Sequence, residues 1–219
     1  MEKKIGILNN YADEPITAPS ASYFAQFIDS NDIINICHGE EIGDINKYEG
    51  YIISGSRSCH KDQSAWINYL KEVISDIYLN NIPCLAVCFG HQIVADMFGG
   101  KTIVNSNGEE GFQDVPTSAN NEVPKLFSDL PNPLKIYQSH NDAVLEVPKI
   151  ASNVLKNEKC VQYYELGSIY SIQSHPEISV ANAVNIAKRD NQNVETILNG
   201  VTNENIQSHF ILKNFINLI

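Results

Sequence analysis

Residues 83–98 limit the possible folds of this chain more than any other stretch. Residues 83–87 form a short apolar run after a proline, which predicts a fully buried strand. After a turn that carries Cys88 and Gly90, apolar residues recur at helical spacing as far as Phe98. A strand, a tight turn bearing a cysteine and a helix together predict a nucleophile elbow. We expect the Cys88 thiol to lie above a sheet, where the positive end of the helix favours its thiolate form.

Two other residues of this stretch bear on that prediction. Gly90 is expected because a larger side chain at so sharp a bend would collide with the adjoining strands. Many free cysteines are inert members of a core, and Cys84, within the predicted strand, is expected to be one. The strand and helix that flank Cys88 favour a nucleophile there instead.

The composition describes an ordinary globular protein. With 219 residues, of which 43% are hydrophobic and 19% charged, we expect one domain spanning residues 1–219. A net charge of −11, with no block of Lys and Arg, argues against nucleic acid or a membrane surface as a partner. Five cysteines without C-x-x-C spacing indicate a reducing compartment. The first apolar stretch is too short for a signal peptide, and none reaches the roughly 20 residues that cross a bilayer, so we expect a cytoplasmic protein.

Strands and helices alternate in the first half of the chain. We expect strands at residues 4–8, 33–37, 50–54 and 83–87, and helices at 20–28, 64–80 and 92–98. This alternation predicts an α/β fold with a doubly wound, mainly parallel central sheet and flanking helices.

The second half is expected to contain shorter elements. Strands at 102–104, 111–115, 134–137 and 143–145 suit antiparallel additions at the edge of the sheet. Three more strands are expected at 154–156, 161–164 and 168–173. Two helices, at 180–188 and 206–218, would close the chain.

A cysteine nucleophile needs a base, and the base needs a group that orients it. His175 and Glu177 lie two residues apart at the end of a predicted strand, and Pro176 between them keeps the backbone extended. Both side chains can then lean the same way, which suits a Cys–His–Glu triad. His175 would take the thiol proton, and Glu177 would fix its tautomer. Without the cysteine motif, the His-Pro-Glu sequence would fit an ordinary turn with no catalytic role equally well.

Four motifs occur in an order that resembles one enzyme family. A-V-C-F-G-H-Q at 86–92 and Q-S-H-P-E at 173–177 resemble the G-x-C-x-G-x-Q and H-P-E motifs of class I, triad-type glutamine amidotransferases. I-S-G-S at 53–56 resembles the oxyanion-strand motif of that family. S-H-N-D at 139–142 resembles the S-H-x-D segment of its GMP-synthetase-like branch. The resemblance covers essentially the whole chain.

This resemblance implies a flavodoxin-like α/β fold and a specific reaction. Cys88 would attack the side-chain amide of glutamine, release ammonia and leave a γ-glutamyl thioester that water hydrolyses. The backbone amides of Gly55 and Phe89 would form an oxyanion hole, each contributing roughly 3–4 kcal/mol. The resemblance further implies substrate contacts by Gln92, Ser56, His140 and Asp142.

No metal or organic cofactor is expected. The acids and histidines near these motifs lack the spacing of zinc-binding sequences such as H-E-x-x-H. A thiolate–imidazole pair accounts for them better. We therefore expect no metal at His91, His140, His175, Asp142 or Glu177.

The chain departs from the family motifs in ways that bear on its branch. Ala86 stands where the family usually has glycine, and Ser56 replaces the second glycine of S-G-G-P. With Trp66 about ten residues later, this form resembles stand-alone γ-glutamyl peptidase-like relatives. The H-x-D segment occurs in both branches. Arg57 has a planar fork that suits a substrate carboxylate, whereas Cys59 and His60 are expected to be surface residues near the cleft.

Several functions stay open on these grounds. The chain is expected either to hydrolyse glutamine or a γ-glutamyl compound by itself, or to donate ammonia to a separate synthetase such as GMP synthetase. A catalytically silent binding or regulatory relative is a third reading, which the presence of Cys88, His175 and Glu177 disfavours. Another α/β enzyme with a cysteine nucleophile, such as a cysteine peptidase, would lack Gln92 together with the distal motif.

Overall fold

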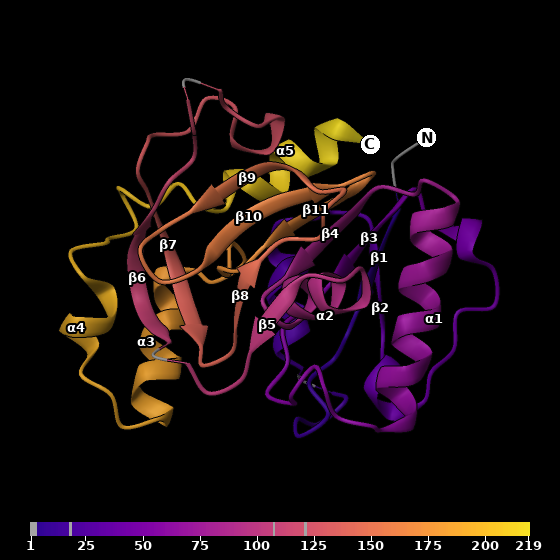
Figure 1. The fold of residues 1–219 in the computed structure, drawn as a ribbon. Helices are drawn as coiled ribbons and strands as arrows, with labels where there is room; N and C mark the ends of the chain where they lie inside the picture. Colours follow the sequence, from indigo (N-terminus) through magenta and orange to yellow (C-terminus); the bar gives the residue numbers. More distant parts are fainter. Residues whose placement is uncertain (1–3, 18, 107, 121) are drawn as a thin grey trace.

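A seven-stranded sheet runs through the centre of the molecule (Figure 1). The structure, a computed structural model, describes residues 4–17, 19–106, 108–120 and 122–219, so the start of the chain before Lys4 lies outside the described residues. The spatial order of the strands is β2 (Asn31–Ile34), β1 (Ile5–Leu8), β3 (Gly50–Ile53), β4 (Cys84–Val87), β11 (Ile169–Ile172), β10 (Val161–Leu166) and β9 (Ser152–Lys156).

The first five strands of this order are parallel, and the last two are antiparallel to their neighbours. With β11 in fifth place, the parallel part has the strand order of flavodoxin-like folds. Every residue of β1, β3 and β4 is buried, as expected for strands covered on both faces. The predicted mainly parallel sheet with an antiparallel edge is confirmed.

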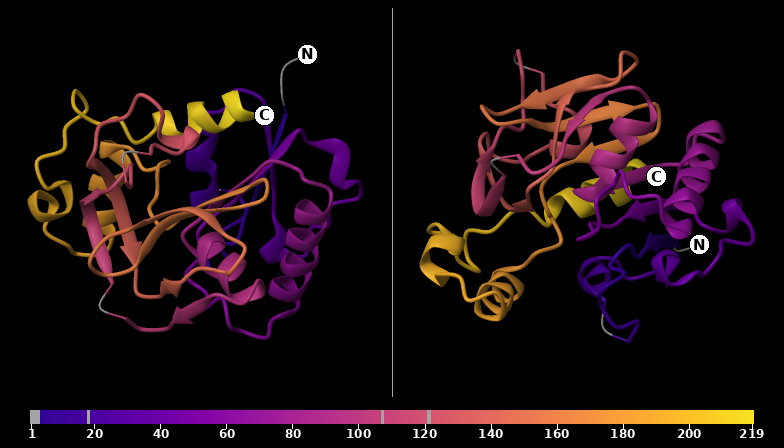
Figure 2. Two further views of the ribbon diagram at one scale, coloured as in Figure 1. Left: turned by 45° about the horizontal axis from the view of Figure 1, so that its top comes forward. Right: turned by 60° about the horizontal axis from the view of Figure 1, so that its bottom comes forward.

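Helices cover both faces of the sheet, as Figure 2 shows. Neighbouring residues of a strand point to opposite faces, so Ile52 and Ile53 of β3 belong to different apolar clusters. The Ile53 cluster includes helices α1 (Ala65–Leu79) and α2 (Phe89–Met97), and the Ile52 cluster includes α5 (Phe210–Leu218). The parallel strands therefore end between two helical layers, with their carboxyl ends at one edge.

Four strands lie outside the central sheet. β5 (Lys101–Ile103) pairs with β8 (Ala143–Glu146), and β6 (Glu109–Val115) pairs with β7 (Leu134–His140). The pairing is antiparallel as predicted, but its expected place at the edge of the central sheet is wrong, because these strands form two separate two-stranded sheets. A two-residue turn at Gly167 (φ 59°) folds β10 back onto β11, and β10 and β9 occupy that edge instead.

Residues 20–28 were predicted as a helix, and of these Ser20–Gln26 form a 3₁₀ helix. Its buried residues Ala21 and Phe24 are three apart, the period of a 3₁₀ helix. The second strand also ends earlier than predicted, because the chain turns into a short helix after Ile34. The 3₁₀ helices are η1 (Ser20–Gln26), η2 (Ile36–His38), η3 (Ile45–Lys47) and η4 (Lys125–Phe127).

The C-terminal region contains one helix that the sequence did not predict. Besides α3 (Val180–Arg189), a short α4 (Val194–Leu198) forms in the Asn-rich join, where the Asn193 side chain accepts a hydrogen bond from the Thr196 amide at 3.0 Å. The last helix begins at Phe210 rather than near residue 206. In the part of the chain that the structure describes, no helix has the length and apolar character needed to cross a membrane.

Candidate active site

Cys88 lies in the turn between β4 and α2, with φ 52° and ψ −99°. A positive φ is strained for a residue with a side chain, and such strain is concentrated at functional sites. The Cys88 amide donates to the Ile172 carbonyl oxygen at 2.9 Å, so β11 holds the turn in place. A Cβ added to Gly90 would lie 2.9 Å from the Ile53 carbonyl oxygen. The predicted elbow and its need for glycine are both present.

His175 and Glu177 follow β11 and reach the same edge of the sheet. The His175 amide donates to the Tyr137 carbonyl oxygen at 2.8 Å, which ties this segment to β7. His175 Nδ1 lies 2.7 Å from Glu177 Oε1, and the two residues are only 6% and 1% exposed. Because Glu177 engages Nδ1, Nε2 is the ring nitrogen left for the thiol. The pair has the geometry expected of a base and its orienting acid.

The charges around His175 favour its protonated form. Burial of the ring lowers its pKa, but the charges of the Glu177 carboxylate and the Cys88 sulfur hold the pKa well above its usual range. The Cys88 thiol also lies 3.8 Å from the Ser139 carbonyl oxygen, an acceptor for its proton. The site can therefore hold a proton on His175 beside a sulfur nucleophile.

Cys88 borders two cavities of unequal size. One, of about 80 Å³, is lined by His175, Tyr11 and Arg189, among others. The other, of about 390 Å³, is lined by Gln92, among others. Residues that border both are Ser56, Arg57, Cys88 and Ser139. A small substrate can thus approach the sulfur from a cleft that continues on both sides of it.

Gly55 packs against His175. A Cβ added there would lie 2.9 Å from His175 Cε1 and 2.7 Å from the Tyr11 hydroxyl oxygen. In the described ranges, the backbone amides of Gly55 and Phe89 donate no hydrogen bond. Phe89 is the first residue of α2, whose first amides have no partner within the helix. Both amides are free for an oxyanion, although their role in binding one stays a prediction.

The loop after Gly55 is fastened to the first strand. The Ser56 hydroxyl donates to the Asn10 carbonyl oxygen at 2.6 Å and accepts from the Ser58 amide at 3.0 Å. Ser56 therefore shapes the loop with its hydroxyl, and its predicted substrate contact is untested. Arg57 borders the cleft half-exposed and pairs with Asp13 at 3.3 Å.

The other predicted substrate contacts form the wall of the larger cavity. Gln92 Nε2 donates to the Asp142 carbonyl oxygen at 2.9 Å, and His140 Nδ1 donates to the same oxygen at 2.9 Å. Gln92 thereby links α2 to the loop between β7 and β8. Contacts of these three residues with a substrate stay predictions.

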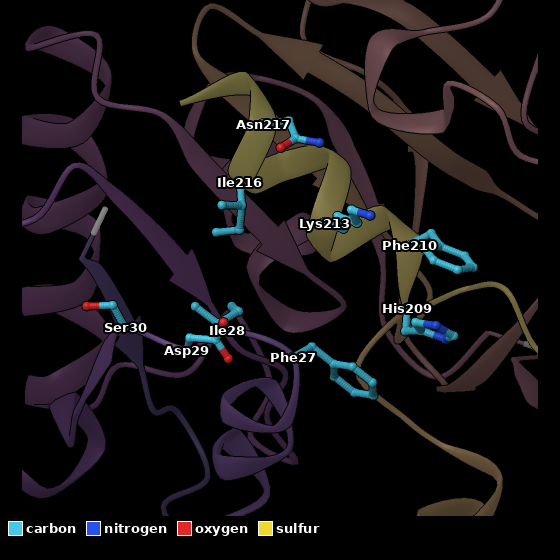
Figure 3. A pocket seen from close by; sticks show the side chains of 9 residues that line it. All are labelled: Phe27, Ile28, Asp29, Ser30, His209, Phe210, Lys213, Ile216 and Asn217. Carbon is cyan, nitrogen blue, oxygen red and sulfur yellow. The ribbon is translucent and has the colours of Figure 1, made fainter. Parts of the chain in front are cut away.

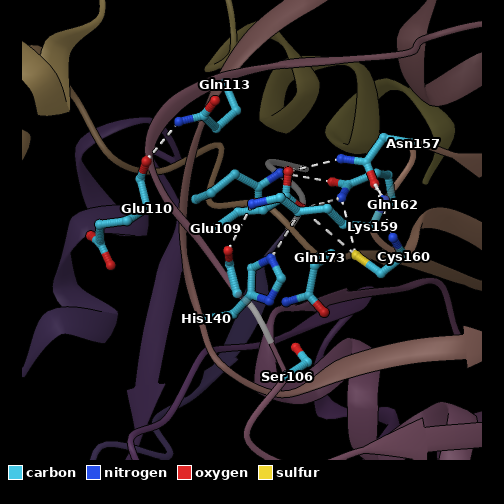
Figure 4. Close-up of polar contacts among 12 residues, drawn as sticks. Ser106, Glu109, Glu110, Gln113, His140, Asn157, Lys159, Cys160, Gln162 and Gln173 are labelled. Carbon is cyan, nitrogen blue, oxygen red and sulfur yellow. Dashed lines mark hydrogen bonds and ion pairs between the residues drawn. The ribbon is translucent and has the colours of Figure 1, made fainter.

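A buried polar network supports this wall from behind, as Figure 4 shows. Glu109 accepts hydrogen bonds from Gln162 at 2.7 Å and from Asn157 at 2.8 Å, and His140 Nε2 lies 3.3 Å from the same carboxyl group. These contacts join β6, β7 and β10. His140 is therefore held from both ring nitrogens.

Tyr11 and Ser139 are site residues that were not predicted from the sequence as part of the site. Burial, and after it the charges of Glu177 and Cys88, raise the pKa of Tyr11 well above its usual range, so the phenol stays protonated. Tyr11 comes shortly after β1, and open α/β sheets place their sites beyond the carboxyl ends of strands. Applied to the first strand, that rule would have indicated Tyr11 as a candidate site residue. Ser139 belongs to the S-H-N-D motif noted in the sequence, but it contributes its backbone oxygen, which that motif does not indicate.

A cavity of about 580 Å³ lies elsewhere, between the end of η1 and α5 (Figure 3). The Phe27 and His209 rings stack at its rim with centroids 5.4 Å apart. Its lining includes no cysteine and no member of the Cys88 site. This cavity therefore offers no cysteine nucleophile.

Comparison with known families agrees with this site. The sequence model of "Glutamine amidotransferase class-I" matches residues 28–188, most of the chain. This chain belongs to the class-I glutamine amidotransferase family. The match spans the region that contains Gly55, Cys88, His175 and Glu177.

Individual relatives fall into two groups. "Gamma-glutamyl peptidase 3" of Arabidopsis thaliana is 32% identical over 154 residues, which cover 67% of this chain and 62% of the relative. The chain thus matches less than two thirds of that protein's length. One subunit of the glutamine-hydrolyzing GMP synthase of Methanosphaera stadtmanae is 33% identical over 154 residues, covering 69% of this chain and 76% of the relative.

A solved structure supports the fold alone. A glutamine amidotransferase from Thermotoga maritima superposes with a TM-score of 0.79 over 100% of this chain and 96% of that one, at 19% identity.

Proposed function

We propose that this glutamine amidotransferase-family chain hydrolyses the side-chain amide of glutamine, or a related γ-glutamyl bond, through a thioester on Cys88. The main observation behind the proposal is that the Cys88 turn lies beside the His175–Glu177 pair, whose Nδ1–Oε1 distance is 2.7 Å. Family membership supports the same chemistry. No cofactor is required, because side chains and backbone amides supply every group.

The proposed reaction proceeds in two stages. His175 takes the thiol proton, and the Cys88 sulfur adds to the γ-carbonyl carbon of the substrate. The amides of Gly55 and Phe89 stabilise the oxyanion. His175 returns the proton to the departing amine, which leaves as ammonia or an amino compound. Water, activated by His175, then releases glutamate and restores the thiol, while Glu177 keeps the ring oriented throughout.

Contacts of the Gly55 loop favour an enzyme that acts by itself. The Asn10 amide donates to the Ser54 hydroxyl, and Asn10 Nδ2 donates to the Ser54 carbonyl oxygen, each at 3.1 Å. Ser56 adds its own bond to Asn10 at 2.6 Å. The loop is therefore anchored within this chain, whereas an ammonia donor that needs its synthetase for activity would gain from a loop that the synthetase aligns.

A second candidate is an ammonia donor to a separate synthetase. It is favoured by the 33% identity to a subunit of the GMP synthase of Methanosphaera stadtmanae. Steady-state turnover of the purified chain on glutamine and on a γ-glutamyl dipeptide, with Cys88→Ala as the blank, separates the two. Turnover by the chain alone supports the proposal. Turnover that appears only with an added synthetase supports the donor, and none under either condition supports a silent binding relative.

Two further proposals concern the chain as a whole. We propose that residues 1–219 fold as one domain, because the two largest of the three apolar clusters share the central sheet. We also propose a reducing, cytoplasmic location, in keeping with five cysteines that form no disulfide. The expected partners are a small γ-glutamyl substrate and, for the donor candidate, a synthetase.

A further inference from the structure

Three side chains with metal-binding donor atoms meet at the wall of the larger cavity. The donor atoms of Cys59, His60 and Asp142 all lie within 4.8 Å of one another. Cys59 and Asp142 line the same 390 Å³ cavity as Cys88. His60 is fully buried, so its predicted position at the surface is wrong. The proposed reaction uses neither Cys59 nor His60.

His60 is held at one ring nitrogen. The Thr102 hydroxyl oxygen lies 2.9 Å from His60 Nε2 and 3.4 Å from Asp96 Oδ1. Nδ1 is therefore the ring nitrogen that faces Cys59 and Asp142. Within the described residues Nδ1 has no hydrogen-bond partner, although it lies 3.4 Å from Asp142 Oδ2. A buried imidazole nitrogen without a hydrogen bond thus faces a carboxylate oxygen, and in its neutral form with the proton on Nε2 it can share a cation with that oxygen.

The spacing of these atoms suits a tetrahedral ion. Around zinc, with bonds of about 2.0–2.2 Å to nitrogen and oxygen, neighbouring ligand atoms lie about 3.4 Å apart. The observed distance from His60 Nδ1 to Asp142 Oδ2 is 3.4 Å. Sulfur, imidazole nitrogen and carboxylate oxygen form a donor set that zinc prefers. The hydrogen-bonded chain from Asp96 through Thr102 to His60 is the kind of outer contact that orients a metal-binding histidine.

We propose that Cys59, His60 and Asp142 form a binding site for zinc or a similar divalent ion, with a fourth position open to the catalytic cavity. On binding, the Cys59 thiol releases its proton to solvent and the thiolate coordinates the ion.

The position of Asp142 links this site to the proposed reaction. Its Oδ1 accepts from the Asn105 amide at 3.0 Å, and its carbonyl oxygen accepts from Gln92 at 2.9 Å. An ion held here occupies the cavity that borders Cys88 and excludes substrate from it. Zinc is therefore a reversible inhibitor. This consequence rests on the proposed function, whereas metal binding does not.

A second cluster, Glu109, His140 and Cys160, also brings its donor atoms within 4.8 Å of one another. There the donors already have partners. Gln162 Nε2 donates to Glu109 Oε2 at 2.7 Å and to the Cys160 sulfur at 3.2 Å. Among the described residues, no buried nitrogen or oxygen atom of Glu109 or His140 lacks a hydrogen bond, unlike His60 Nδ1, so the second cluster supplies the control.

Cobalt titration tests the site without any activity measurement. In the Cys88→Ser protein, which lacks the catalytic thiol, Co²⁺ is expected to give one thiolate-to-cobalt charge-transfer band at one equivalent. Adding Cys59→Ser removes the band, whereas adding Cys160→Ser leaves it. Absence of the band, or its loss with Cys160→Ser rather than Cys59→Ser, overturns the proposal. Thr102→Val is expected to weaken Co²⁺ binding by roughly 10–100-fold, and unchanged affinity contradicts the role of the outer contact.

A second arm tests inhibition. Zinc is expected to stop turnover of the unmodified chain, and a chelator restores it. Cys59→Ser keeps its basal turnover and needs at least about tenfold more zinc for inhibition, a loss of binding free energy of about 1.4 kcal/mol. Equal sensitivity of the two proteins would place the inhibitory ion at Cys88 and overturn the inhibitory role. If the unmodified chain shows no turnover, the proposed function is wrong. The cobalt titration tests the metal site independently of that result.

Discussion

His175 Nδ1 lies 2.7 Å from Glu177 Oε1, and the two side chains are buried beside Cys88. Residues two apart in an extended segment share a side of the chain but lie well separated along it. Here the chain leaves β11 before His175 and turns, with the Ile178 amide donating to the His175 carbonyl oxygen at 3.3 Å. The extended backbone predicted at Pro176 is therefore wrong, and it is the turn that places the Glu177 carboxylate against the His175 ring.

Replacing Glu177 with glutamine should lower the pKa of His175. Burial opposes protonation of the ring, and Glu177 is the largest influence that favours it. Histidine NMR signals followed against pH measure the change, and His209, remote from the site, serves as the internal reference. Turnover should fall by roughly 10²–10⁴-fold, the range of general-base catalysis. A His175 titration that does not move would contradict the assigned pair.

The raised pKa of His175 also predicts a pH dependence of folding. The folded pKa lies above the unfolded value of about 6.5. Its stabilisation is therefore fully present below about pH 6.5 and is lost as pH rises through the folded pKa. Urea unfolding at a series of pH values should show this loss in the unmodified protein and a smaller one in Glu177→Gln. If the free energy of unfolding depended on pH equally in the two proteins, the assigned His175–Glu177 interaction would be refuted.

Gly90→Ala should damage the elbow. The added Cβ would lie 2.9 Å from both the Ile53 carbonyl oxygen and its Cγ2 atom, so β3 and α2 must separate. We expect a loss of roughly 1–3 kcal/mol in the free energy of unfolding, as for overpacked cores, together with reduced turnover. Gly43→Ala is the matched control, since nothing lies within 4 Å of its added Cβ. Equal stability of the two variants would show that the elbow tolerates a side chain.

Ser56→Ala tests whether the Gly55 loop is held ready. The change removes the 2.6 Å bond to Asn10 and the acceptor for the Ser58 amide. Each bond is worth roughly 0.5–1.5 kcal/mol, so turnover should fall up to about tenfold with little change in KM. Ser58→Ala, which keeps the backbone amide, should behave like the unmodified chain. A raised KM with unchanged turnover would instead assign Ser56 to substrate binding.

Local contacts explain why parts of the site were predictable. The elbow depends on residues adjacent in sequence, from the apolar run of β4 through Cys88 to α2, and His175 and Glu177 are two residues apart. Tyr11 and Ser139 reach the same place only through the tertiary fold. Their contacts depend on where β1 and β7 end in space, which no local pattern records.

The same distinction holds for the fold. The strands β1, β3 and β4 are continuous buried runs of mainly apolar residues, so their existence was predictable. For the antiparallel strands between residues 101 and 172, no local sequence pattern indicates which strand pairs with which. The pairing of β5 with β8, for example, joins strands about forty residues apart in the sequence. Near Phe24, apolar residues three apart fit either kind of helix, and the structure has the 3₁₀ form.

Covalent labelling tests the central claim most directly. The purified chain is treated with a diazo-ketone analogue of glutamine, with and without excess glutamine, and the modified cysteine is identified by peptide mass mapping. We predict one adduct, on Cys88, that glutamine prevents and that His175→Ala slows. An adduct on Cys59 or Cys160 with Cys88 intact would contradict the assignment of Cys88 as the nucleophile.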